Sequence, residues 1–104
     1  MWLERVTWYP QIGKQSEVRG IAVDIAKLLN EGGVIRTLIT QVVAGPEAET
    51  IVGVAAYESL GDYEATLKAR REDPQFQSVW AKMNPLLGAP TKRELVEVVA
   101  SFPT

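Results

Sequence analysis

The sequence contains no cysteine and no histidine. Without cysteine the chain forms no disulfide, holds no thiolate-bound metal and lacks a cysteine nucleophile. Without histidine it lacks the commonest general base, the commonest transition-metal ligand and the usual proximal haem ligand. These absences predict a protein without a metal or cofactor, so any chemistry would use a pocket of aromatic and a few polar side chains.

The sequence also lacks an excess of positive charge and any long hydrophobic run. The formal net charge is −2, whereas a nucleic-acid surface needs a clustered excess of positive charge. Lys68, Arg70 and Arg71 form a basic run, but acidic residues follow at once, which is typical of a solvated helix face. No apolar run approaches the roughly 20 residues that span a bilayer, and residues 1–5 carry charges, unlike a signal peptide. We expect a cytoplasmic protein without nucleic-acid partners or a membrane span.

Hydrophobic periodicity divides the 104 residues into the elements of a single domain, 1–104. In chain order the pattern predicts a strand over 2–9, a helix over 15–31, strands over 34–44 and 51–57, a helix over 60–83 that is broken at 72–74, and a strand over 92–100. The order β-α-β-β-α-β predicts an α+β domain with a ferredoxin-like fold. In that fold a four-stranded antiparallel sheet carries both helices on one face.

Local signals predict where these elements begin and end. Ser16 is a candidate N-cap for the first helix, and Gly20 inside that helix is interpreted as a close approach to the sheet. Ser59, with an acid three residues later, resembles a capping box, and the aspartate–proline pair at 73–74 predicts a second helix start. Residues 85–90 contain two prolines and a glycine, which predicts a loop before the last strand.

The strands predicted over 34–44 and 51–57 carry apolar side chains on both faces. In the first of them the two faces present Val34, Leu38 and Val42, and Ile35, Ile39 and Val43. Successive strand side chains point to opposite faces, so such a strand needs cover on both sides. The predicted helices cover only one face. We therefore predict a homodimer, in which the sheets of two copies meet and form an eight-stranded barrel.

Several of these signals resemble a known family. The segment 57–64, where an apolar strand ends in a tyrosine and a serine precedes a helix, and the Asp-Pro-Gln-Phe step at 73–76 are similar to the second half of a NIPSNAP-type domain. The first half agrees more loosely, at Glu4, Thr7, Trp8, Gly13 and Lys14. Val6 departs from the family, which commonly has an arginine there. The resemblance covers most of the chain and implies the dimeric α+β barrel superfamily.

That resemblance does not imply one activity. The dimeric α+β barrel scaffold serves cofactor-free monooxygenases, isomerases, haem enzymes and proteins of unknown role, so fold alone says little about function. The haem-using members generally rely on a histidine ligand, which this chain lacks. The resemblance therefore agrees with the expectation of a protein without a cofactor.

Six residues are candidates for lining a ligand pocket: Glu4, Trp8, Arg36, Tyr57, Tyr63 and Trp80. The four aromatic residues would give a ligand large apolar contact and a few polar handles, or they would fill the core and an interface. Glu4 and Arg36 are expected on mostly buried strands, where each charge needs a partner. Glu4 is then either one half of an ion pair or a general base whose pKa is raised by burial.

Two classes of function remain open from the sequence. The first is a small dimeric barrel that binds or transforms an apolar or aromatic small molecule without a cofactor. The second is a non-catalytic structural or protein-interaction module whose interior is filled by side chains. A cavity above roughly 300 Å³ with a few convergent polar groups would favour the first, and a fully packed interior the second.

Overall fold

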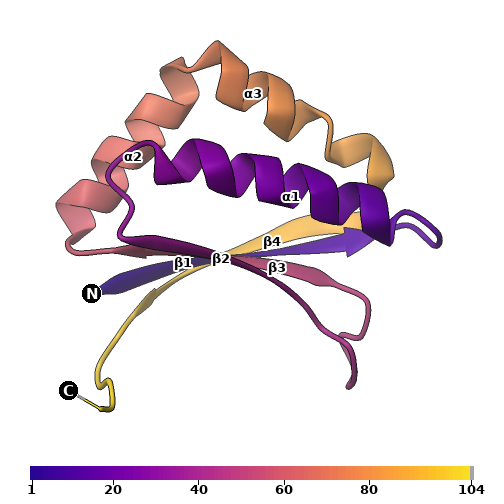
Figure 1. Ribbon diagram of the computed structural model, residues 1–104, viewed down its shortest axis with the longest axis horizontal. Helices are drawn as coiled ribbons and strands as arrows, with labels where there is room; N and C mark the ends of the chain where they lie inside the picture. The colour runs from indigo at the N-terminus through magenta and orange to yellow at the C-terminus, as the bar shows by residue number, and fades with distance from the viewer. Residues whose placement is uncertain (104) are drawn as a thin grey trace.

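The computed structural model describes residues 1–103 and has the predicted order of elements (Figure 1). They are β1 (Trp2–Pro10), α1 (Gln15–Asn30), β2 (Arg36–Gln41), β3 (Ile51–Tyr57), α2 (Leu60–Glu72), α3 (Pro74–Ala81), a 3₁₀ turn η1 (Asn84–Leu86) and β4 (Leu87–Glu97). The strands form one antiparallel sheet in the order β2-β3-β1-β4. The helices all lie on one face of it, as Figure 1 shows. The predicted ferredoxin-like α+β fold is confirmed.

Strand register decides which residues of the sheet meet the helices. Val6 of β1 and Ile39 of β2 both lie opposite Gly53 of β3 and point to the covered face, where Trp8 packs beside them. A Cβ atom at Gly53 would stand 3.1 Å from the Trp8 ring, closer than packed carbons normally approach. A side chain at position 53 would therefore collide with the indole of Trp8, which explains the glycine.

Helix α1 packs its apolar stripe on this face, with Val18, Ala22 and Ile25 buried. Two expectations about the helix are wrong. The N-cap is Lys14, and Ser16 lies exposed inside the first turn, because the chain enters the helix two residues earlier than the capping preference suggested. Gly20 has no atom within 4 Å of where its Cβ would stand, so no close approach explains it.

The predicted break between the next two helices is confirmed, because each helix start has its own side-chain cap. The Ser59 hydroxyl accepts a hydrogen bond from the Asp62 backbone N–H at 3.1 Å and begins α2. The Asp73 carboxylate accepts from the Gln75 N–H at 2.9 Å, and Pro74 takes the first position of α3. Proline is favoured there because its missing N–H would have no helical partner.

Strand β4 begins earlier than its turn residues predicted. Residues Leu87–Glu97 form the strand, so Gly88 and Pro90 lie within it and the loop predicted over 85–90 is only the turn η1 at its start. A proline is tolerated because β4 is an edge strand, where one side of the ladder needs no N–H donor. The pairing of β1 with β4 shifts register after Thr7.

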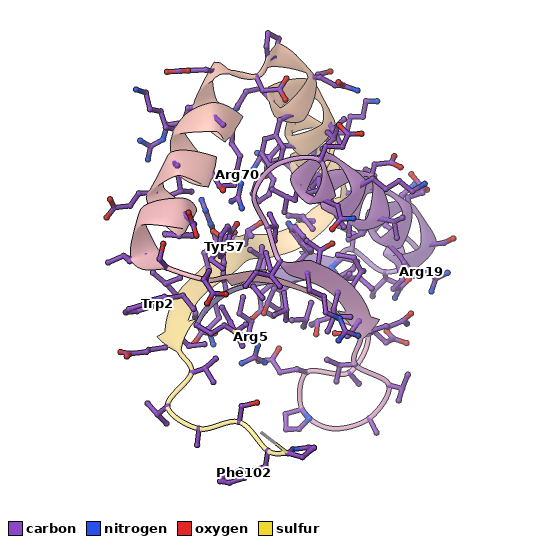
Figure 2. All side chains as sticks on the ribbon, turned by 60° about the vertical axis from the view of Figure 1, so that its left-hand side comes forward. Trp2, Arg5, Arg19, Tyr57, Arg70 and Phe102 are labelled. Carbon is purple, nitrogen blue, oxygen red and sulfur yellow. The ribbon has the colours of Figure 1, made fainter. Side chains whose placement is uncertain are left out.

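The second face of the sheet has no helix over it. Its apolar side chains are Leu3, Leu38, Val52, Val54, Ala56 and Val96, as the strand register assigns them. Leu38 and Val96 are 44% and 40% exposed. Charges lie on this face as well, since Glu94 approaches Arg5 at 4.0 Å and Lys92 at 3.6 Å. Figure 2 shows Arg5 pointing to the opposite side of the sheet from Arg70 and Tyr57.

Candidate functional site

A carboxylate lies in the middle of the covered sheet face, where apolar packing would be expected. Glu4 of β1 is 3% exposed. Its Oε1 accepts a hydrogen bond from Nη1 of Arg70 at 2.8 Å, and its Oε2 accepts from Nη2 of Arg93 at 2.7 Å. The Tyr63 hydroxyl also donates to Oε2, at 3.3 Å. The predicted need of Glu4 for a partner is met by two arginines from different elements.

Arg70 reaches Glu4 because it lies on the apolar side of α2. It follows Tyr63 and Leu67 at helical spacing, so all three side chains project from the same side of the helix. The other guanidinium nitrogen, Nη2, donates to the Tyr57 hydroxyl. Its Nε is buried and has no acceptor within residues 1–103. The sequence interpretation of Arg70 as part of a solvated helix face is therefore wrong, whereas Lys68 and Arg71 are exposed as expected.

The charges around Glu4 favour its ionised form. Burial alone would raise the pKa of Glu4, but the charges and hydrogen bonds of Arg70 and Arg93 outweigh burial and hold the pKa below its ordinary value of 4.5. A general base works best with a pKa near the operating pH. The ion-pair interpretation of Glu4 is supported, and the alternative of a base with a raised pKa is not.

Two tyrosines complete the polar cluster. The rings of Tyr57 and Tyr63 meet edge to face with centroids 5.2 Å apart. Burial raises the pKa of Tyr57 to about 12, and burial together with the Glu4 charge raises the pKa of Tyr63. Both hydroxyls therefore stay protonated at neutral pH. We call Glu4, Tyr57, Tyr63, Arg70 and Arg93 the ion cluster.

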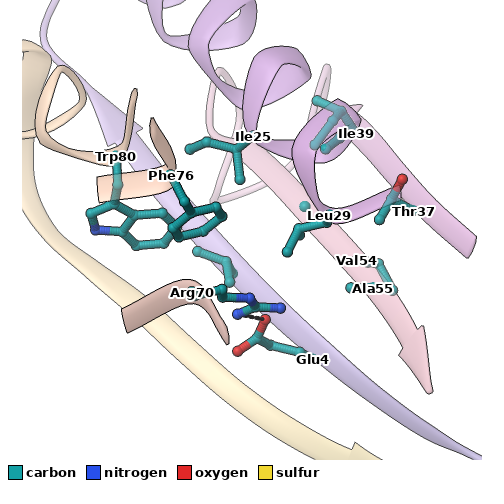
Figure 3. A pocket seen from close by; sticks show the side chains of 13 residues that line it. Glu4, Ile25, Leu29, Thr37, Ile39, Val54, Ala55, Arg70, Phe76 and Trp80 are labelled. Carbon is teal, nitrogen blue, oxygen red and sulfur yellow. Dashed lines mark hydrogen bonds and ion pairs between the residues drawn. The ribbon is translucent and has the colours of Figure 1, made fainter. Parts of the chain in front are cut away.

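An apolar cavity lies beside the ion cluster, between the sheet and the helices (Figure 3). Ile25, Leu29, Ile39, Phe76 and Trp80 line it, and the Glu4–Arg70 pair closes one side. The cavity has a volume of about 20 Å³, which is room for a single water molecule.

A wider groove, which we call the outer groove, adjoins this cavity between α2, α3 and β4. It has a volume of about 190 Å³. Its lining residues are Leu67, Arg70, Arg71, Phe76, Gln77, Trp80 and Arg93. Arg70, Phe76 and Trp80 line both hollows, so the cavity and the outer groove adjoin at these three side chains.

The structure separates the six candidate residues. Glu4, Tyr57 and Tyr63 meet in the ion cluster, and Trp80 lines both hollows. Trp8 is 2% exposed in the core and meets Trp80 edge to face at 6.0 Å. Arg36 is exposed on β2, opposite Ala56, on the face without helices. Its predicted burial is wrong because β2 is an edge strand and Arg36 lies at its end.

Sequence reasoning missed Arg70, Arg93 and Phe76 as members of this region. Helical spacing could have found Arg70, since it lies seven residues after Tyr63 on the same stripe. Alternation from Leu95 could have placed Arg93 on the covered face. The Arg93 guanidinium lies 5.9 Å from the Trp80 ring centroid, and the Arg70 guanidinium lies 5.7 Å from that of Phe76.

Two kinds of feature are absent from residues 1–103. They hold no group of three or more acidic, histidine or cysteine side chains placed to bind a metal ion. No helix in the same range is long and apolar enough to cross a membrane.

Similar folds occur among solved structures. No protein-family model matches the chain, and no curated protein matches it in sequence. An uncharacterised NIPSNAP domain protein from Burkholderia xenovorans superposes with a TM-score of 0.80 at 22% identity, over 100% of this chain and 99% of that one. SnoaB, a cofactor-independent oxygenase from Streptomyces nogalater, gives 0.74 at 13% identity, over 99% and 98%. Rv0793 from Mycobacterium tuberculosis gives 0.75 at 15% identity, over 97% of each chain.

At these sequence identities, structural similarity establishes the fold but not an activity, because one fold hosts many functions. The resemblance to NIPSNAP domains that the sequence motifs indicated is confirmed at this level. The chain shares its fold with a NIPSNAP domain protein and with a cofactor-independent oxygenase.

Proposed function

We propose that this protein is a cytoplasmic homodimer that binds or transforms an apolar or aromatic small molecule without a cofactor. The observation that carries the proposal is the ion cluster beside two hollows with aromatic walls. A buried ion pair is commonly no more stable than well-packed apolar residues in its place. The cost of burying Glu4 and Arg70 is therefore better explained by a ligand than by stability.

The hollows suggest how such a ligand would sit. The cavity of about 20 Å³ is too small for an organic molecule. The outer groove of about 190 Å³ is open and has Phe76 and Trp80 in its wall. We therefore place the ring of the ligand in the outer groove, against these two aromatic side chains. SnoaB, which has this fold and is described as a cofactor-independent oxygenase, supports a site that works without a cofactor.

The homodimer is part of the proposal, because the sheet face without helices keeps exposed apolar side chains. Leu38 and Val96 are both more than one third exposed there. The same face of a second copy would cover these side chains, and the two four-stranded sheets together would make the eight-stranded barrel. The β2–β3 connector and the C-terminal end reach past the sheet on this side (Figure 1), where they would flank the second copy.

A thermal-shift screen with aromatic and polyketide-like metabolites tests the small-molecule site. A ligand at 100 times its Kd stabilises the folded state by about 2.7 kcal/mol. For a domain of this size that is a rise in midpoint of roughly 10 °C or more. The matched variants are Gln77→Trp, which fills the outer groove, and Ser78→Trp, which places the same side chain on the exposed side of α3. We expect the ligand-induced shift to vanish in the first variant and to persist in the second.

The alternative is a non-catalytic structural or protein-interaction module, and the volumes of the two hollows, about 20 and 190 Å³, favour it because both are below roughly 300 Å³. Under this alternative no metabolite in the screen raises the midpoint. A shift that survives Gln77→Trp would contradict the outer groove as the site. Sedimentation at micromolar concentration tests the homodimer, and a well-folded monomer there would contradict it.

A further inference from the structure

The outer groove carries an excess of positive charge in a protein whose net charge is −2. Three of its lining residues are arginines, namely Arg70, Arg71 and Arg93, and none is acidic. Like charges that share a site raise one another's free energy unless an opposite charge joins them. The groove therefore has a composition that favours an anion.

The protein itself supplies only part of the compensating charge. Glu4 is the carboxylate that contacts this set, with one oxygen bound to Arg70 and the other to Arg93. Arg71 makes no ion pair within 4.0 Å among residues 1–103. The groove thus holds three guanidinium groups, and Glu4, whose two oxygens bind Arg70 and Arg93, compensates only part of their charge.

A second observation points the same way. The Arg70 side chain is 9% exposed, yet its Nε finds no acceptor in the described part of the chain. A buried donor without a partner loses its hydration without a replacement hydrogen bond, which costs more when the group is charged. A bound anion beside this guanidinium would stabilise its buried charge. Arginine also offers paired N–H groups that match a carboxylate.

The rest of the groove wall suits a ring. Phe76 and Trp80 stack with centroids 5.8 Å apart and an interplanar angle of 22°. The groove volume of about 190 Å³ is below the roughly 300–1,000 Å³ of drug-sized pockets. The site therefore fits a small acid with one or two rings.

We infer that the ligand is a small aromatic acid. Its acidic group would lie against Arg71 and Arg93, beside the Arg70 guanidinium, and its ring against Phe76 and Trp80. This inference rests on the proposed small-molecule site and adds the charge of the ligand. It also assigns a role to Arg71, which lines the groove without forming an ion pair in the described chain.

A pair of probes separates the charge of the ligand from its ring. The probes are 2-naphthoate and 2-naphthamide, which have the same ring system and differ in that only the first is an anion. Isothermal titration calorimetry of the full chain measures their Kd values at neutral pH. We expect the acid to bind at least about tenfold more tightly than the amide, because charge-assisted hydrogen bonds are the stronger class.

Two single-charge variants of α2 complete the experiment. Arg71→Gln removes a groove cation, and Lys68→Gln removes an exposed cation of the same helix that lines neither hollow. We expect Arg71→Gln to weaken the acid by roughly tenfold while leaving the amide unchanged, and Lys68→Gln to leave both Kd values within about twofold. Circular dichroism checks that both variants are folded.

Each other result has a definite meaning. Equal affinity for acid and amide overturns the anionic ligand and leaves the aromatic site of the proposed function standing. Equal weakening by Arg71→Gln and Lys68→Gln overturns the groove as the anion site. Failure of the folded protein to bind either probe at millimolar concentration counts against both the inference and the proposed function.

Discussion

Nη1 of Arg70 donates to Oε1 of Glu4 over 2.8 Å and so connects α2 to β1 across 66 positions of sequence. The two side chains are 9% and 4% exposed, so this is a buried ion pair. Arg93 shares the same carboxylate from β4. One negative charge therefore links two strands and a helix, and its removal leaves two arginines without a counter-charge.

Glu4→Gln should destabilise the protein strongly. Breaking a buried pair by removing one partner typically costs about 3–5 kcal/mol, because the remaining charge stays buried. The free energy of unfolding in urea, at one fixed protein concentration, measures the loss. Glu17→Gln is the control, since Glu17 pairs with Lys14 at 3.3 Å on the surface and should cost less than about 1 kcal/mol. Equal losses in the two variants would contradict the assigned role of Glu4.

The same carboxylate should make stability depend on acid pH. The pKa of Glu4 is lowered in the folded protein, so the unfolded chain binds its proton first as the pH falls. The stabilisation is therefore complete above the ordinary pKa of 4.5 and is lost as the pH falls from there through the folded value. Urea unfolding between pH 7 and pH 3 should show a smaller acid-induced loss in Glu4→Gln than in the wild type. Parallel curves would exclude Glu4 as the source.

The raised pKa of Tyr57 should be visible in an alkaline titration of the folded protein. Burial raises its pKa to about 12, so the folded state keeps the phenol protonated. The stabilisation is present below the ordinary value of 10.0 and is lost as the pH rises from there toward 12. In a titration followed by tyrosinate absorbance, Tyr57→Phe should remove a component that ionises near pH 12. Loss of a component near pH 10 instead would place Tyr57 in water.

The starts of α2 and α3 could be predicted from the sequence because their capping signals are local. The Ser59 and Asp73 caps each act on a backbone N–H within three residues, so the chain displays donor and acceptor together. The start of β4 was predicted too late in the chain because it depends on the position of the strand in the sheet, which is not a local signal. Judged from its sequence neighbours alone, Pro90 indicates a loop. A proline is tolerated in β4 only because β4 lies at the edge of the sheet.

The candidate site was only partly predictable, because its contacts join distant segments. The sequence indicated that Glu4 needs a partner, but it did not show that the partner is Arg70, 66 positions away. Lys68, Arg71 and Glu72 lie close to Arg70 in sequence and are charged and exposed, so a local average hides its burial. The prediction for Arg36 was wrong in the opposite sense, because it was expected to be buried but lies exposed on an edge strand.

Gly20 in α1 and Gly53 in β3 should respond in opposite ways to alanine. Gly20→Ala adds a methyl group to an exposed helix position with no atom within 4 Å and should stabilise by roughly 0.5–1 kcal/mol through the higher helix propensity of alanine. Gly53→Ala places a Cβ 3.1 Å from the Trp8 ring and should destabilise by about 1–3 kcal/mol through overpacking. Thermal unfolding of both variants measures the signs. A destabilising Gly20→Ala would indicate a contact that the subunit alone does not make.

A charge on the open sheet face should separate the proposed dimer. Leu38 is 44% exposed on that face, and Val23 is 37% exposed on α1. Leu38→Lys would bury an ammonium group at the sheet-to-sheet contact, which is costly without a partner. Val23→Lys makes the same chemical change on the helix side, where it stays in water. Sedimentation equilibrium should give a dimer for the wild type and Val23→Lys, and a folded monomer or a far weaker dimer for Leu38→Lys. If only Val23→Lys dissociated, the helices rather than the sheets would form the contact.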